Sequence, residues 1–250
     1  MFKTRYDENT IRIKRKGVAD RLVKESVNIK STRITKISNG DLQILFRYYD
    51  QIFFDNWFEN NFKGKFEFSL SRRMTRSAGI TMCPKNISSL NPEQVKIEIR
   101  MGIDFFFKYD QLDGSKVVCG IETRNSLEAL QIVFEHEICH AIEFIIHNKS
   151  NCHADRFKKL SNNLFGHTDS HHKMPTNRQI ACAKFGINVG DKVDFIYDGK
   201  RINGIISGIN KRAAVMVRNT KGAFVDKLGN RYVKYYVPVN CVQKPENPAK

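Results

Sequence analysis

The stretch EHEICHAIEF, residues 135–144, carries two histidines four positions apart, with a glutamate directly after the first. On a helix this spacing sets the imidazoles of His136 and His140 one turn apart on the same side, where both can bind one Zn²⁺ at about 2.0–2.1 Å. Glu137 then lies beside the position that a catalytic zinc keeps for water, so it is the expected general base. These residues predict a hydrolytic site with one zinc ion.

A catalytic zinc needs a third protein ligand. The strongest candidate is His153, because a helix that ends near His147 and a turn through residues 148–152 would bring the start of a second helix back to the metal. His147 itself is expected to cap the first helix. All seven histidines lie between positions 136 and 172, so the sequence leaves other ligands open, namely Glu143, His167, His171 and His172.

Helices must hold these side chains in place. Asn125 and Glu128 have the spacing of an N-terminal capping pair, and an apolar period of 3.6 predicts a helix from Asn125 or Ser126 to about residue 147. A second helix is expected over residues 154–164. An earlier amphipathic helix should start behind a cap at Asp41, with its apolar face made by Leu42, Phe46, Tyr49, Phe53 and Trp57.

Short alternating segments over residues 65–70, 77–83 and 94–101 predict a small sheet beside these helices. A hairpin closed at Asp113–Gly114 is expected to follow. After Gly186 the pattern becomes all-β, with turns at residues 198–199 and 210–211, and five or so short strands there predict a small barrel.

The chain is therefore expected to have three parts. A basic N-terminal extension covers residues 1–38 and includes a short helix around residues 17–27. The metal-binding domain covers residues 39–185, and the small β-barrel covers residues 187–245.

The formal net charge of the 250 residues is +16. Residues 1–38 hold 11 Lys and Arg against 4 Asp and Glu, and residues 186–250 hold 12 against 5, so the excess lies at the two ends. Clustered cations displace counterions from phosphate backbones, which predicts contact with nucleic acid. The alternative is charge that serves only solubility.

The composition also bounds the location of the protein. No apolar run reaches the roughly 18 residues of a membrane span, and the N-terminus has no secretory signal pattern. The six cysteines are scattered without a C-x-x-C pair, as expected of reduced thiols. We expect an intracellular protein, cytoplasmic or nuclear, with no membrane contact.

The chain resembles the SprT-like zinc metalloproteases, a family that includes Spartan-type proteases acting on DNA–protein crosslinks. Four segments within about residues 41–172 carry the resemblance in the family's order: LFRYYDQIFFDNWF, SRRMTRSAGITMC, FEHEICHAIEF and HADRFKKLSNNLFGHT. The family's third metal ligand lies in the pattern H-G-x-x-F, which maps onto His153 and Phe157, although Ala154 stands where the family has glycine.

The resemblance implies an α+β, zincin-like metalloprotease domain with one Zn²⁺. An SH3-like barrel would follow it here in place of the zinc ribbon that the family often carries. It also implies an endopeptidase acting on DNA-associated proteins, with DNA, including single-stranded DNA, as a partner.

Two other hypotheses remain. One is a non-proteolytic nucleic-acid-binding adaptor whose zinc braces the fold, and the other is a zinc hydrolase acting on RNA or a small amide. Glu137 favours the peptidase over the adaptor, because a structural zinc site does not use a base. The lack of a second carboxylate-rich cluster in the sequence argues against two-metal phosphoryl transfer.

Overall fold

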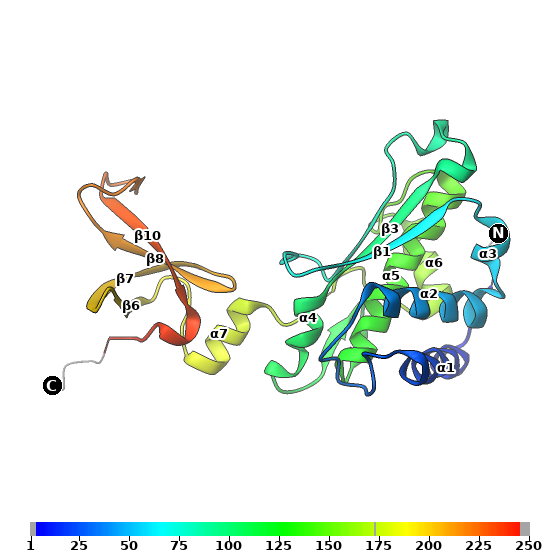
Figure 1. Cartoon of the computed structure of the whole chain (residues 1–250), viewed down its shortest axis with the longest axis horizontal. Coiled ribbons are helices and arrows are strands. Elements are labelled where there is room, and N and C mark those ends of the chain that lie inside the picture. Colours follow the sequence, from blue (N-terminus) through cyan, green and yellow to red (C-terminus); the bar gives the residue numbers. More distant parts are fainter. Residues whose placement is uncertain (1–3, 173, 246–250) are drawn as a thin grey trace. The chain divides into compact units, whose positions relative to one another are not determined.

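The computed structural model describes residues 4–172 and 174–245, and the chain forms two compact units, residues 1–174 and 175–250. In the first unit, helices pack against a small mixed sheet (Figure 1). Among the described residues, no helix is long and apolar enough to cross a membrane. The fold is of the α+β class that the sequence predicts.

The sheet of the first unit has three strands in the order β1-β3-β2. Strand β1 (Lys65–Ser71) runs parallel to β3 (Lys96–Gly102), and β2 (Gly79–Met82) pairs with β3 in the antiparallel sense. Every second side chain of β3 is buried in the main core, namely Ile97, Ile99 and Met101. This alternation is what a strand with one covered face requires.

Helix α5 (Ser126–His147) is the central helix of this unit (Figure 1). Its N-cap is Asn125, whose side chain accepts a hydrogen bond from the Glu128 backbone N–H at 2.9 Å. The helix ends where Asn148 adopts a left-handed conformation, with φ of 56°. Both ends agree with the prediction, and most of the helix between them is buried.

The N-terminal helix is longer than expected and belongs to the first unit. Helix α1 spans Glu8–Glu25, and Val18 and Leu22 on it are fully buried in the main core. Helix α2 (Asn39–Phe54) starts at Ser38, which forms a reciprocal capping box with Asp41. The expected cap at Asp41 was therefore wrong, because that residue occupies the third position of the helix.

The unit also contains the helices α3 (Trp57–Asn61), α4 (Ile103–Phe107) and α6 (Asp155–Phe165), three short 3-10 helices (Ile87–Ser89, Pro92–Gln94 and Tyr109–Gln111) and the β4–β5 hairpin (Lys116–Val118 and Ile121–Thr123). The hairpin closes at Cys119–Gly120, with φ of 48° and 79° at these two residues, and not at Asp113–Gly114. Two-residue hairpin turns with positive φ match the twist of the strands, so the local backbone explains the shift.

The second unit consists of helix α7 (Asn177–Phe185) and five strands. The strands are β6 (Lys192–Tyr197), β7 (Lys200–Ile209), β8 (Arg212–Arg218), β9 (Phe224–Val225) and β10 (Arg231–Pro238). Turns at residues 198–199 and 210–211 join β6 to β7 and β7 to β8, as predicted. Ala181 of α7 packs in the same core as these strands, and the compact unit to which they belong spans residues 175–250.

The predicted barrel does not close. The strands form an open sheet in the order β6-β7-β8-β10-β9, and within the described residues β6 and β9 do not pair with each other. Strand β9 has only two residues, while the outer edge of β6 bonds to Gln243 through Asp194. A two-residue edge strand is too short to continue the hydrogen-bond ladder around a barrel.

Candidate metal centre

Helix α5 places the two histidines of the HExxH stretch close together. His136 is 4% exposed, and its Nε2 atom lies 3.2 Å from Nε2 of His140. Two nitrogens that bind one tetrahedral zinc at 2.0–2.1 Å are about 3.3–3.4 Å apart. The observed spacing is close to that value, so the two imidazoles fit a single cation.

Their protonation state also suits a metal. Burial lowers the pKa of His136 well below its ordinary value and lowers the pKa of His140 to about 4. Both rings are therefore neutral near pH 7. Since a metal binds the neutral imidazole, no proton has to be lost from either ring before binding.

A chain of hydrogen bonds orients His140. Its Nδ1 atom lies 2.6 Å from Oγ of Ser150, and that hydroxyl donates to Glu143 at 2.7 Å. Arg156 donates to the other oxygen of Glu143 at 2.6 Å. Because the Ser150 proton is used on Glu143, the Ser150 oxygen accepts the proton of His140 Nδ1. The Nε2 atom of His140 is therefore unprotonated, and its lone pair can bind a cation.

His136 has a different neighbour on its far side. Its Nδ1 atom lies 3.8 Å from Sγ of Cys119, in the turn of the β4–β5 hairpin. Burial raises the pKa of the Cys119 thiol far above its ordinary value, so the sulfur stays protonated. The hairpin thus supplies a weak polar contact to Nδ1 of His136. The turn after α5 supplies a hydrogen bond to Nδ1 of His140.

Glu137 is 2% exposed and reaches β2. Thr81 donates from Oγ1 to Oε2 of Glu137 at 2.8 Å and lies 3.0 Å from the Glu137 backbone carbonyl. Burial raises the pKa of Glu137 to about 8, although the hydrogen bonds from Thr81 oppose this shift. This pKa lies near neutral pH, where a side chain can both take up and release a proton.

Gly79 explains why β2 can come so near to the base. A Cβ atom at this position would lie 2.6 Å from Oε1 of Glu137 and 2.8 Å from a methyl group of Val133. No side chain fits in that space. The glycine of the segment SAGITMC is therefore required by the close approach of β2 to Glu137.

Comparison with known protein families decides the family. A sequence model of the SprT-like family matches residues 42–177, more than half of the chain. The protein belongs to the SprT-like family. This membership suggests a metalloprotease, and the matched region contains the whole HExxH stretch. No curated protein and no solved structure matches the chain.

The first compact unit, residues 1–174, is called the SprT-like unit below. In it, a second buried carboxylate, Glu135, lies directly before His136. Glu135 is fully buried and accepts two hydrogen bonds from the Arg15 guanidinium, at 2.8 and 2.7 Å. Tyr49 donates to it at 2.7 Å, and Nε2 of His167 lies 3.0 Å away. Burial alone would raise the pKa of Glu135, but Arg15 and His167 lower it overall, so the group remains a carboxylate.

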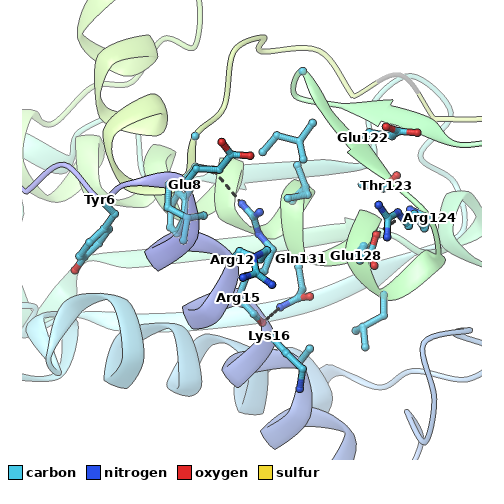
Figure 2. Close-up of a pocket in the computed structure, with 18 of the residues that line it drawn as sticks. Tyr6, Glu8, Arg12, Arg15, Lys16, Glu122, Thr123, Arg124, Glu128 and Gln131 are labelled. Atoms are coloured by element: carbon cyan, nitrogen blue, oxygen red, sulfur yellow. Dashed lines mark hydrogen bonds between the residues drawn. The ribbon is translucent and has the colours of Figure 1, made fainter.

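Arg15 belongs to α1, which lies upstream of the matched residues. Its backbone carbonyl also accepts a hydrogen bond from Gln131 of α5 at 2.9 Å, and Figure 2 shows these two residues facing each other across the two helices. Helix α1 is thus joined to the metal-binding helix at two points. Sequence inspection missed this contact, because nothing local to residue 15 indicates a partner 120 positions away.

The hollow drawn in Figure 2 is separate from the HExxH residues. It measures about 1060 Å³ and lies between α1, residues 120–125 and the first half of α5. Among the described residues that line it, cations such as Arg12 and Arg124 alternate with acids such as Glu8 and Glu122. A lining of mixed charge favours neither anionic nor cationic ligands.

Among the described residues, His153 is in neither of the His and Cys groups whose donor atoms lie within 4.8 Å of one another. His153 is exposed, its ring centre lies 6.1 Å from that of His171, and its backbone N–H bonds to Asn151. Cys152 comes closer, since its Sγ and the ring nitrogens of His136 and His140 all lie within 4.8 Å of one another. The assignment of His153 as a ligand stays a prediction.

The other candidate ligands fall into two groups. Glu143 and His167 are engaged with Arg156 and Glu135, and the exposed His171 bonds to Asp169 at 2.8 Å. His172 is different, because its ring centre is 4.6 Å from that of His136. Sequence spacing gave no means of separating His172 from its neighbour.

Proposed function

We propose that this SprT-like protein is a zinc-dependent endopeptidase. The observation that carries the proposal is the pair of neutral imidazoles with their Nε2 atoms 3.2 Å apart, with the buried carboxyl group of Glu137 between them in the sequence of the same helix. His136 and His140 would hold one Zn²⁺, and the resemblance to SprT-like proteases adds His153 as the third ligand. Such a zincin-like site keeps a position for water.

Each residue has a defined part in peptide hydrolysis. Bound zinc would polarise the attacking water and the substrate carbonyl. Glu137 accepts the proton of the water and later delivers it to the leaving amine. Thr81 fixes the Glu137 carboxylate through Oε2, which leaves the other oxygen for proton transfer. Gly79 provides the space in which this carboxylate lies.

We further propose that the substrates are DNA-associated proteins, including DNA–protein crosslinks. The support is the SprT-like resemblance and the position of the positive charge. The excess of Lys and Arg over Asp and Glu lies in residues 1–38, which include α1, and in residues 186–250. Small sheets with exposed cations and aromatic side chains suit single-stranded nucleic acid. The SH3-like character of this unit belongs to the same proposal.

One observation favours a second candidate function. Cys152 lies within 4.8 Å of the ring nitrogens of His136 and His140. If its thiolate also binds the zinc, the site approaches the closed set of protein ligands that structural zinc sites have. The protein would then be a zinc-containing nucleic-acid-binding adaptor without peptidase activity.

Replacing the base separates the two functions. Glu137→Gln should bind about one zinc per chain, as the unaltered protein does, and should lose cleavage of a protein substrate in the presence of single-stranded DNA. The neighbouring Glu128→Gln, at the start of α5, serves as the control. Full cleavage by Glu137→Gln would remove the proposed mechanism, and no cleavage by the unaltered zinc protein would favour the adaptor.

The nucleic-acid partner is tested by charge substitution and not by deletion, because α1 contributes to the core. Two triple variants remove exposed cations, one from residues 1–38 (Lys24, Lys30 and Lys36 to Gln) and one from the second unit (Lys200, Arg212 and Lys221 to Gln). Each cation that neutralises a phosphate should, when removed, reduce the slope of log affinity against log salt by about 0.7–0.9. Unchanged slopes in both variants would assign the charge to solubility.

A further inference from the structure

The segment after α6 folds back onto the β4–β5 hairpin. The carbonyl of Cys119 accepts hydrogen bonds from the backbone N–H groups of Thr168 and Asp169 at 3.1 and 3.2 Å, and the Cys119 N–H donates to the carbonyl of His171 at 3.0 Å. Val118 and His172 then form an isolated β-bridge. These main-chain bonds fix the position of residue 172 independently of its side chain.

Gly120 makes this close contact possible. Its φ is +79°, and a Cβ atom there would lie 1.9 Å from Oγ1 of Thr168. Both the conformation and the space exclude a larger residue. The hairpin turn and the segment 168–172 therefore form one packed structure beside α5.

This packing directs the His172 ring at His136, the first histidine of the HExxH pair. Its centre lies 4.6 Å from that of His136, with the two rings nearly perpendicular at 83°. One ring nitrogen of each histidine and Sγ of Cys119 all lie within 4.8 Å of one another. His172 thus approaches the metal centre from a segment that does not include α5.

The Nε2 atom of His172 is buried and has no hydrogen-bond partner within the described residues. An unsatisfied buried polar group destabilises the folded state. His167 has a similarly unpartnered Nδ1, but its other nitrogen is bonded to Glu135. His172 differs from His167, because its unpartnered nitrogen belongs to a ring that packs against His136, a proposed metal ligand.

The adjacent histidine shows that this arrangement is specific. The side chain of His171 is 68% exposed, and its Nδ1 lies 2.8 Å from Asp169. Two successive residues of the same type therefore have different environments, one in solvent and one against His136. A cation bound by His136 would give the buried nitrogen of His172 the partner that it does not find among the described residues.

We propose that His172 binds, through Nε2, the cation that His136 holds. The inference rests on the proposed function only in that it uses the same zinc site. The cation then has an imidazole ligand from the strand-like segment that crosses the β4–β5 hairpin, in addition to the ligands named above.

The direct test uses the unaltered full-length protein. With ¹⁵N-labelled histidine, long-range proton–nitrogen NMR spectra are recorded without metal and with one equivalent of Zn²⁺. The Nε2 resonance of His172 should move to the position of a metal-bound nitrogen, while both nitrogens of His171 should keep theirs. A His172 Nε2 resonance that is unaffected by zinc would overturn the proposal.

A matched pair of variants gives the energetic test. His172→Gln should weaken Zn²⁺ or Co²⁺ binding by about 10–100-fold and change the visible spectrum of the Co²⁺ protein, whereas His171→Gln should leave both as in the unaltered protein. Equal affinities and spectra in the two variants would refute the assignment. Peptide cleavage is not needed for either measurement, so this result and the Glu137→Gln result can fail separately.

Discussion

The two units of the chain differ in what they bury. Within the described residues, every buried polar or charged residue belongs to the SprT-like unit: Ser26, Asp41, Asp50, Thr81, Thr123, Ser126, Gln131, Glu135, His136, Glu137, Glu143, Ser161 and His167. In residues 175–245 the buried positions are apolar. Buried polar groups are costly unless they are bonded, so their concentration around α5 marks the part of the molecule where chemistry is placed.

The difference in buried polar groups between the two units should be clearest when the cation that pairs with Glu135 is removed. Arg15→Ala leaves the carboxylate of Glu135 buried without its cation, and we expect the SprT-like unit to lose about 3–5 kcal/mol of unfolding free energy. Trp57, the only tryptophan, lies in this unit, so urea unfolding followed by its fluorescence measures the effect. The Arg201–Asp194 pair in the second unit provides the control. Arg201→Ala should cost about 0–1 kcal/mol at most, measured by hydrogen exchange of the β6 and β7 backbone amides. Similar small losses in both variants would contradict the assigned role of Glu135.

Two glycines without room for a Cβ atom give the next comparison. Gly79→Ala should displace Glu137 and reduce peptide cleavage by about 10²-fold or more, with zinc content unchanged. Gly204→Ala, where a Cβ would lie 2.6 Å from Val215, should destabilise the second sheet and leave peptide cleavage unaltered. Cleavage rates and zinc content of both variants are to be measured together, and a fully active Gly79→Ala would disprove the close approach to the base.

A smaller effect is expected in the apolar core of the second unit. Ile206 is 1% exposed, and Ile206→Val should cost about 0.5–1.5 kcal/mol. Hydrogen exchange of the backbone amides of β7 and β8 measures this loss. Zinc affinity and the Trp57 unfolding transition should stay the same, because these strands bury an apolar core of their own. A change in zinc affinity would show that the two units are energetically coupled.

The smallest effect concerns acid. Burial alone would raise the pKa of Asp41, but hydrogen bonds from Ser26, Asn28 and Ser38 lower it below its ordinary value. The stabilisation is therefore present above the unfolded pKa of about 3.9 and is lost as the pH falls through the lower folded value. The stability advantage over Asp41→Asn, measured by urea unfolding at each pH, should shrink below about pH 4. An advantage that stays constant from pH 7 to pH 3 would contradict this account.

Helix α5 and its pair of histidines were predictable because the information is local. The Asn125 cap, the apolar period and the HExxH spacing all lie within a few turns, and the helix has the predicted bounds. The order of elements around it followed from the SprT-like resemblance, which the match to residues 42–177 confirms. The zinc ion and the roles of His153 and Glu137 remain predictions.

The parts that were not predictable depend on distant contacts. Helix α1 buries a narrow face, including Val18 and Leu22, and its pairing of Arg15 with Glu135 spans 120 positions. The approach of His172 to His136 depends on a β-bridge to Val118, more than fifty residues away. The open second sheet resulted from the two-residue length of β9, which strand propensity does not indicate.

The contact between Arg15 and Glu135 affects where a folded fragment of this protein can start. Residue 42, at which the family match starts, lies downstream of the whole of α1. A fragment cut at that point would keep the complete HExxH stretch and still expose the helix beneath it, with an unneutralised carboxylate one residue before His136. The smallest autonomous fragment therefore starts upstream of Arg15, although the residues that define the family do not.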